Sequence, residues 1–234
     1  MNEIVFVEYV KKLGIDIDDK MLSQLNRYYE LLIEKNKVMN LTNIIIKEEV
    51  YLKHFYDSLT LTMVCDFNEQ TSLCDVGTGA GLPGLVLKII YPHLRVVLID
   101  STEKKVVFLK EVIDKLGLEK IEAIHARAED YAKNNRECFD VVTSRAVARL
   151  SILTELCLPL VKVGGHFISM KAHAEEELKE IEENLKILSS GIEKIKVFSL
   201  PIEASNRTLI KIKKENIIEK KYPREFKEIK RKPL

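Results

Sequence analysis

The first 65 residues place apolar side chains every three to four positions, which is the spacing of amphipathic helices. Met21–Met39 follows this pattern throughout, and Glu48–Val64 repeats it with Phe55 among its candidate core positions. The segment Asn40–Asn43 between them is rich in residues that form turns and N-caps. The pattern therefore predicts a helical extension over residues 1–65.

The pattern changes after residue 72, where short apolar segments alternate with amphipathic helical ones. Short connections between such segments indicate βαβ units and a mostly parallel sheet flanked by helices. The predicted strands are Leu73–Val76, Arg95–Ile99, Ile121–His125, Phe139–Thr143 and His166–Met170, and the predicted helices are Leu82–Ile90, Glu103–Leu116, Leu150–Leu160 and Glu175–Ile187. Ile195–Leu200 and Thr208–Ile212 are expected to form a terminal antiparallel hairpin. We predict one α/β domain over residues 66–214.

The composition is that of a folded globular protein, with 46% hydrophobic and 31% charged residues in a chain of 234. Its apolar segments are far shorter than the roughly 20 residues that a membrane-spanning helix needs. The N-terminus has neither the basic region nor the cleavage site of a signal peptide. None of the four cysteines forms a C-x-x-C pair or has a histidine at metal-binding spacing. We predict a cytoplasmic protein with no membrane anchor and no metal site.

The charge is distributed unevenly along the chain. Lys211–Leu234 holds ten Lys or Arg against four Glu, a local net charge of +6, whereas the whole chain carries +1. A basic tail on a mildly acidic body favours a polyanionic partner. A solvated tail that keeps the protein soluble explains the charge equally well. Residues 215–234 are accordingly predicted to form a basic C-terminal tail.

The strongest chemical motif is the glycine-rich segment Asp75–Gly84, which follows a predicted strand and opens a predicted helix. Glycines there allow a tight turn and let a ligand approach the backbone closely. Gly79, Gly81 and Gly84 also satisfy the dinucleotide pattern G-x-G-x-x-G, so the motif alone leaves a dehydrogenase open. Asp75 stands two residues before Gly77, as in the D/E-x-G-x-G loop of class I methyltransferases, and this favours S-adenosylmethionine.

Two further acidic residues follow the next strands. Asp100 ends the second strand about 20 residues after the loop, where a carboxylate accepts ribose hydroxyl groups. Glu129 follows the third strand, where a class I methyltransferase meets the adenine. Together with Asp75, Gly77 and Gly79, these residues form the predicted S-adenosylmethionine site. The acids also have structural interpretations, because Asp100 can cap a helix and Glu129 can be solvated.

The chain resembles the ribosomal RNA small-subunit methyltransferase G family, also called glucose-inhibited division protein B. The motifs that carry the resemblance are Asn40-Leu-Thr42, His54-Phe-x-Asp-Ser-Leu59, Asp75–Gly84, Leu98-Ile-Asp-Ser101, Phe139-Asp-x-Val142, Ser144-Arg-Ala146, Gly165-x-Phe-x-x-x-Lys171, Tyr222-Pro-Arg224 and Lys232-Pro-Leu234. The resemblance extends over nearly the whole chain, and the combination of these motifs is specific, whereas the glycine loop alone is not. One departure is Glu225–Ile229, where the family usually has Gly and Pro.

The resemblance implies a Rossmann-like class I methyltransferase that methylates N7 of one guanosine in 16S ribosomal RNA. It places cofactor contacts on Gly77, Leu82, Ala128, Glu129 and Arg145. The implied partner is 16S ribosomal RNA or the small ribosomal subunit. Nothing in the sequence has the pattern of an oligomer interface, so we expect a monomer.

Guanine N7 carries a free lone pair and no proton, so its methylation requires alignment but no general base. The sequence lacks the Asn/Asp-Pro-Pro-Tyr/Phe loop used for exocyclic amines and the Pro-Cys pair used for cytosine C5. Arg145 and Lys171 end the fourth and fifth predicted strands, at the edge where ligands bind open α/β sheets. We predict positioning roles for both, Arg145 on cofactor or guanine and Lys171 on a phosphate. The alternatives are an ion pair for Arg145 and a surface position for Lys171.

His54 and Asp57 lie three residues apart, on one face of their predicted helix. They are either a wall of the site or a core histidine and a local cap. For the protein as a whole, a small-molecule methyltransferase and a non-catalytic module that binds cofactor or RNA are the alternative functions.

Overall fold

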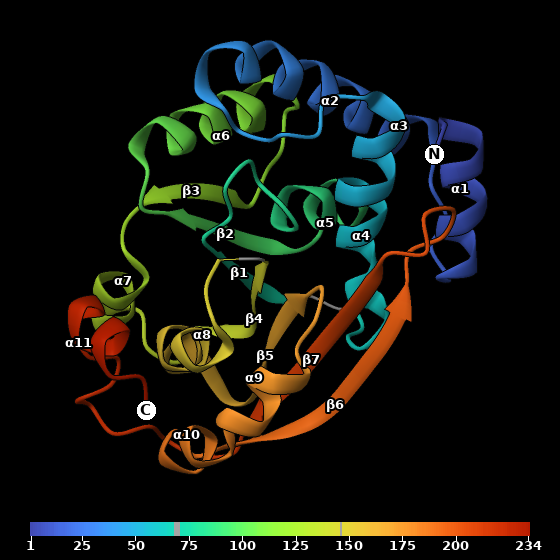
Figure 1. The fold of residues 1–234 in the computed structure, drawn as a ribbon. Coiled ribbons are helices and arrows are strands. Elements are labelled where there is room, and N and C mark those ends of the chain that lie inside the picture. The colour runs from blue at the N-terminus through green and yellow to red at the C-terminus, as the bar shows by residue number, and fades with distance from the viewer. Residues whose placement is uncertain (68–70, 146) are drawn as a thin grey trace.

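The structure is a computed structural model that describes residues 1–67, 71–145 and 147–234 (Figure 1). Within these residues one sheet has the strand order β3-β2-β1-β4-β5-β7-β6. The strands are β1 Ser72–Val76, β2 Arg95–Asp100, β3 Ile121–His125, β4 Phe139–Arg145, β5 Val161–Lys171, β6 Ser190–Ser199 and β7 Asn206–Lys214. The first five are parallel, and β7 pairs antiparallel with both β5 and β6. The predicted α/β fold and the terminal hairpin are confirmed.

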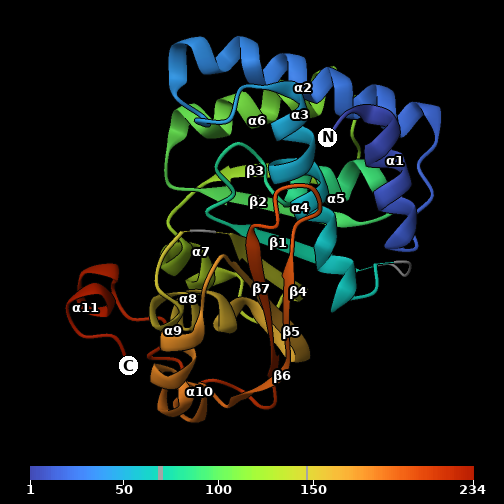
Figure 2. The ribbon, with the colours of Figure 1, turned by 45° about the vertical axis from the view of Figure 1, so that its right-hand side comes forward.

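Helices cover both faces of this sheet, each over its own apolar cluster (Figures 1 and 2). On one face lie α2 Asp19–Met39, α5 Gly84–Ile90 and α6 Glu103–Lys115. On the other face lie α7 Ala128–Asn134, α8 Leu150–Cys157, α9 Glu175–Glu180, α10 Glu182–Ile187 and α11 Phe226–Arg231. Because β1 lies between β2 and β4, the chain reverses its direction of winding there. Ligands bind open α/β sheets at the carboxyl edge beside this point.

The N-terminal extension is helical, as predicted, but irregular. Its elements are α1 Glu3–Lys12, α2, α3 Lys47–Val50, a π-helical turn Tyr51–Tyr56, α4 Asp57–Leu59 and a 3₁₀ turn Thr60–Met63. The sequence did not predict α1, which begins after Asn2, whose side chain accepts a hydrogen bond from the Val5 N–H at 3.0 Å. The ring of Phe6 on α1 packs edge-on against the ring of Tyr51, with 5.0 Å between the ring centroids. The extension therefore shares its apolar cluster with one face of the sheet.

Other segments differ from their predicted boundaries. The helix predicted at Glu175–Ile187 is two helices, α9 and α10, which meet at the fully buried Ile181. Strand β5 begins at Val161 rather than His166 and runs through both of its glycines. The predicted helix Leu82–Ile90 begins at Gly84, because the preceding residues belong to the glycine loop. Helix α7 was not predicted.

The C-terminal segment 215–234 packs on the body of the protein. Ile218, Tyr222 and Ile229 are buried in the apolar cluster beneath α8, and the segment contains α11. Basic residues alternate with these buried apolar residues along the segment, so its net charge alone did not predict that it packs on the body of the protein. Within the part of the chain that the structure describes, no helix has the length and apolar character needed to cross a membrane.

Candidate cofactor pocket and the arginine network beside it

The glycine loop joins the carboxyl end of β1 to the start of α5. Gly77, Gly79 and Gly81 have φ values of +70°, +61° and +105°, a backbone region that residues with a Cβ rarely adopt. Asp75, which is fully buried, accepts hydrogen bonds from the Thr78 hydroxyl at 2.7 Å and from the backbone N–H of residue 84 at 2.9 Å. Burial raises the pKa of Asp75 to about 6. Asp75 therefore links the beginning and the end of the loop through hydrogen bonds to one buried carboxylate oxygen.

Helix α2 supports the same loop from the N-terminal extension. The hydroxyl of Tyr28, which is fully buried, donates a hydrogen bond to the carbonyl of Ala80 at 2.6 Å. Burial raises the pKa of this phenol, so the hydroxyl stays protonated and remains a donor. The ring of Tyr28 stacks on Phe55, with 5.4 Å between ring centroids. The extension thus holds the loop by packing and by a buried hydrogen bond, a contact that the sequence did not predict.

A pocket opens at the carboxyl edge of β1, β2 and β3, beside the glycine loop. Its lining includes four of the predicted cofactor residues, namely Gly77, Asp100, Ala128 and Glu129. The wall also includes three residues that the sequence did not indicate, namely Val147, Leu156 and Phe226. None of the three belongs to a recognisable motif, and only the tertiary fold brings them to the β-strand ends.

The two acids of the pocket are held differently. Asp100 accepts hydrogen bonds from the backbone N–H groups of Gly79 at 2.9 Å and Thr102 at 2.8 Å, and Lys105 lies 3.6 Å from its carboxylate. It therefore both fixes the loop and lines the pocket. Glu129 stands in the first turn of α7, is only 4% exposed, and has its pKa raised by burial. A carboxylate oxygen offers several acceptor sites, so both acids keep capacity for a ligand.

Two other predicted cofactor residues have different surroundings. Leu82 is buried in the apolar cluster that α2, α5 and α6 share. Gly79 donates its N–H to Asp100, and a Cβ built on it would meet open space. A Cβ on Gly77 would instead lie 2.5 Å from Val147 Cγ2. Gly77 thus permits the close approach that forms the pocket wall, whereas Gly79 is required by its backbone conformation alone.

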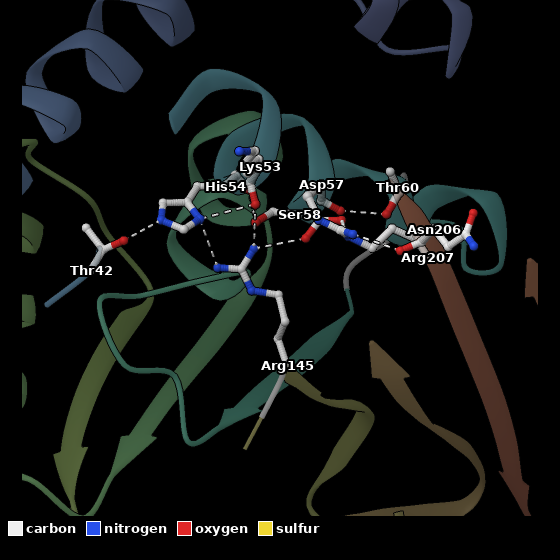
Figure 3. Close-up of polar contacts among 9 residues, drawn as sticks. All are labelled: Thr42, Lys53, His54, Asp57, Ser58, Thr60, Arg145, Asn206 and Arg207. Carbon is white, nitrogen blue, oxygen red and sulfur yellow. Dashed lines mark hydrogen bonds and ion pairs between the residues drawn. The ribbon is translucent and has the colours of Figure 1, made fainter. Parts of the chain in front are cut away.

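Arg145 ends β4 and reaches toward the N-terminal extension (Figure 3), and it is not among the residues that line the pocket. Its guanidinium contacts Asp57 Oδ2 at 3.1 Å and the carbonyl of Lys53 at 3.3 Å. Arg207 on β7 approaches the other oxygen, Asp57 Oδ1, at 2.8 Å. Asp57 is 5% exposed at its side chain, so one buried carboxylate joins three segments that are distant in sequence. The ion-pair interpretation of Arg145 is thus present in the structure.

His54 lies beside the same guanidinium. Its Nδ1 is 3.5 Å from Arg145, and its Nε2 is 2.8 Å from the hydroxyl of Thr42 (Figure 3). Burial, with a smaller contribution from the positive charge of Arg145, lowers the pKa of His54 to about 4. The imidazole is therefore neutral at pH 7. The motifs around residues 40, 54 and 145 therefore meet in one polar network.

Lys171 ends β5 as predicted, but its ammonium group has partners within the chain. It donates to the carbonyl of Ala148 at 2.6 Å and to Glu177 at 2.9 Å. Glu177 also accepts the backbone N–H of Leu150. Lys171 thereby fixes the connection between β4 and α8. Ala146 of the predicted Ser-Arg-Ala motif lies outside the described residues.

The described residues contain no group of three or more His, Cys, Asp or Glu side chains that could hold a metal ion. Cys74 and Cys157 are fully buried, and burial raises the pKa of both thiols. Neither thiol has the character of a nucleophile at neutral pH.

Solved structures of other proteins share this architecture. The crystal structure of a SAM-dependent O-methyltransferase from Thermotoga maritima matches with a TM-score of 0.54 at 16% identity, over 80% of this chain and 73% of that one. A SAM-dependent methyltransferase from Aquifex aeolicus matches with a TM-score of 0.54 at 18% identity, over 74% and 96% of the two chains. At such low identity these likenesses show a shared Rossmann-like fold.

Curated relatives are much closer in sequence. A ribosomal RNA small subunit methyltransferase G from Staphylococcus carnosus is 48% identical over 93% of this chain and 92% of its own length. One from Bacillus velezensis is 48% identical over 96% and 95% of the two chains. The family model described as rRNA small subunit methyltransferase G matches residues 21–209. The resemblance predicted from the sequence motifs is confirmed, and the chain belongs to the rRNA small subunit methyltransferase G family.

Proposed function

We propose that the protein is an S-adenosylmethionine-dependent methyltransferase that methylates N7 of one guanosine in 16S ribosomal RNA. The observation that carries the proposal is the pocket beside the glycine loop, which gathers Gly77, Asp100, Ala128 and Glu129. The names of the curated relatives support ribosomal RNA as the substrate. We further propose that the enzyme acts as a monomer in the cytoplasm.

The residues of the pocket fit S-adenosylmethionine. The loop curls so that Gly77 borders the pocket without a Cβ, which leaves its backbone open to close approach by a ligand. Asp100 and Glu129 offer acceptor oxygens to an adenosine moiety, and Ala128 adds a small apolar surface. When bound, the cofactor supplies an electrophilic methyl group. These four residues would hold it.

The remaining work of the protein is to align the guanine. N7 needs no base to remove a proton, so the chain must orient the base and exclude water. Arg145 contacts Asp57 at 3.1 Å, which holds its positive charge at the edge of the sheet. His54 is neutral at pH 7 because its pKa is about 4, so the network of Asp57, Arg145 and Arg207 carries a net charge of about +1. This charge favours a phosphate or the guanine O6.

A direct test uses transfer of labelled methyl from S-adenosylmethionine to small ribosomal subunits from a strain that lacks this gene. Digestion of the RNA should release labelled 7-methylguanosine from a single site. Gly77→Asp should abolish the label, because the new side chain would occupy the space of Val147 and carry a charge into the pocket. Label in another nucleoside, or no label with cofactor binding intact, would contradict the proposal.

The alternative of a small-molecule substrate cannot be tested cleanly by removing residues 222–234. Tyr222 and Ile229 are buried in the apolar cluster beneath α8, so this truncation would expose the core. A comparison of substrates is the better test, because small subunits should accept labelled methyl groups whereas free nucleosides under the same conditions should not.

A further inference from the structure

The last helix of the chain forms part of the cofactor pocket. Phe226 is the first residue of α11 and lies in the pocket wall together with Ala128 and Glu129. Helices α7 and α11 lie side by side, although nearly 100 residues separate them in the sequence (Figure 1). The ring of Phe226 is partly exposed and packs at the edge of the apolar cluster beneath α8. Its position is therefore at the boundary between core and pocket.

Several contacts fix the approach of this segment to α7. Arg136, just after α7, donates to the carbonyl of Ile218 at 2.8 Å and also to that of Tyr222. Lys133 on α7 contacts Glu225 at 2.9 Å, immediately before Phe226. The segment is thus held to the helix that carries Glu129.

A second anchor joins the same segment to α8. Arg224 contacts both carboxylate oxygens of Glu155, at 2.8 and 2.6 Å, in a bidentate arrangement. Glu155 is fully buried, and it also accepts the backbone N–H of Arg224 at 2.9 Å. A buried carboxylate with three such contacts defines the backbone position two residues before Phe226. The backbone from which the Phe226 side chain extends toward the pocket is therefore anchored to α8.

We propose that Phe226 contacts the adenosine moiety of the cofactor and that α11 closes this end of the pocket. Phe226 borders the pocket where Ala128, Glu129 and Ile99 also line it, so an aromatic ring stands beside an apolar and acidic wall. The guanidinium carbon of Arg127 lies over the ring of Phe226, 5.8 Å from its centroid, within the range of cation–π attraction. Aromatic side chains stack well on nucleobases, since every base presents a π-face. The inference rests on the cofactor assignment above.

The test is the binding of two ligands by the full-length protein, measured by calorimetry. S-adenosylhomocysteine carries an amino-acid portion on the 5′ sulfur of its adenosine moiety, whereas 5′-methylthioadenosine carries only a methyl group on that sulfur. Phe226→Ala should raise the Kd of both ligands by the same factor, roughly tenfold. Lys227→Ala, an exposed neighbour on the same helix, is the matched control and should leave both Kd values unchanged.

Phe226→Leu separates the ring contact from packing, because leucine keeps an apolar side chain without a flat face. It should bind both ligands more weakly than the wild type while its thermal unfolding stays that of the wild type. Wild-type Kd values in both Phe226 variants would overturn the inference. So would a loss confined to S-adenosylhomocysteine, since the ring would then act on the amino-acid portion. Failure of the wild-type protein to bind either ligand would instead overturn the cofactor assignment.

Discussion

Replacing Asp57 by Asn tests whether one buried carboxylate organises the arginine network. The carboxylate is 5% exposed, and its two oxygens bind Arg145 at 3.1 Å and Arg207 at 2.8 Å. An amide keeps one acceptor oxygen and turns its NH₂ group toward the other guanidinium. Hydrogen bonds to charged groups contribute about 1.5–3 kcal/mol each. Both guanidiniums retain some solvent, at 16% and 20% exposure, so we expect a loss of about 2 kcal/mol rather than the ~3–5 of a fully buried broken pair.

For a chain of this length a loss of about 2 kcal/mol corresponds to a fall in Tm of about 4–8 °C. Urea unfolding gives the free energy directly, and methyl transfer to small subunits reports the position of Arg145. We expect kcat/KM for transfer to fall roughly tenfold if about 1.4 kcal/mol of alignment is lost. The Asp57→Asn variant should still bind S-adenosylhomocysteine, because Asp57 is not part of the pocket wall.

Glu30→Gln is the matched control for this change. It also converts a carboxylate to an amide next to an arginine, but Glu30 and Arg27 are 60% and 49% exposed on the surface of α2. Such pairs contribute about 0–1 kcal/mol. Equal stability of the two variants, within about 0.5 kcal/mol, would refute the argument that burial makes the Asp57 network important.

Three further predictions concern the glycine loop and His54. Tyr28→Phe should lower the free energy of unfolding in urea by about 1–2 kcal/mol, because the loop carbonyl that its hydroxyl contacts at 2.6 Å loses its donor; unchanged stability would contradict this. Gly77→Ala should weaken S-adenosylhomocysteine binding more than Gly79→Ala, because only the first Cβ would meet Val147, at 2.5 Å, and equal affinities by calorimetry would refute it. His54 binds a proton near pH 6.5 when unfolded but only near pH 4 when folded, so acidification through this window destabilises the native state. Between pH 6.5 and 4 the wild type should lose on the order of 3 kcal/mol more unfolding free energy than the His54→Gln variant. If plots of unfolding free energy against pH run parallel for the two proteins, protonation of His54 does not destabilise the native state.

Much of the fold was accessible from the sequence because local rules governed it. The strands of the parallel region contain short apolar segments, and the segments between them that were predicted as helices carry amphipathic patterns. The errors fall where a tertiary contact overrides the local pattern. Helix α7 is short and follows Arg127 without a side-chain cap, so its pattern is weak. The break between α9 and α10 buries Ile181, which no local signal marks.

The sequence by itself determined the glycine loop, the acids at the strand ends and the family. These features depend on residue type and on spacing within one βαβ unit, where backbone conformation and strand polarity leave few alternatives. Only the tertiary structure placed Asp57 between Arg145 and Arg207, and Phe226 against α7. Those contacts join residues between about 90 and 150 positions apart, and they depend on how whole elements pack rather than on any local pattern. The sequence thus identified the family and four residues of the candidate pocket, and packing decided which further side chains line and support that pocket.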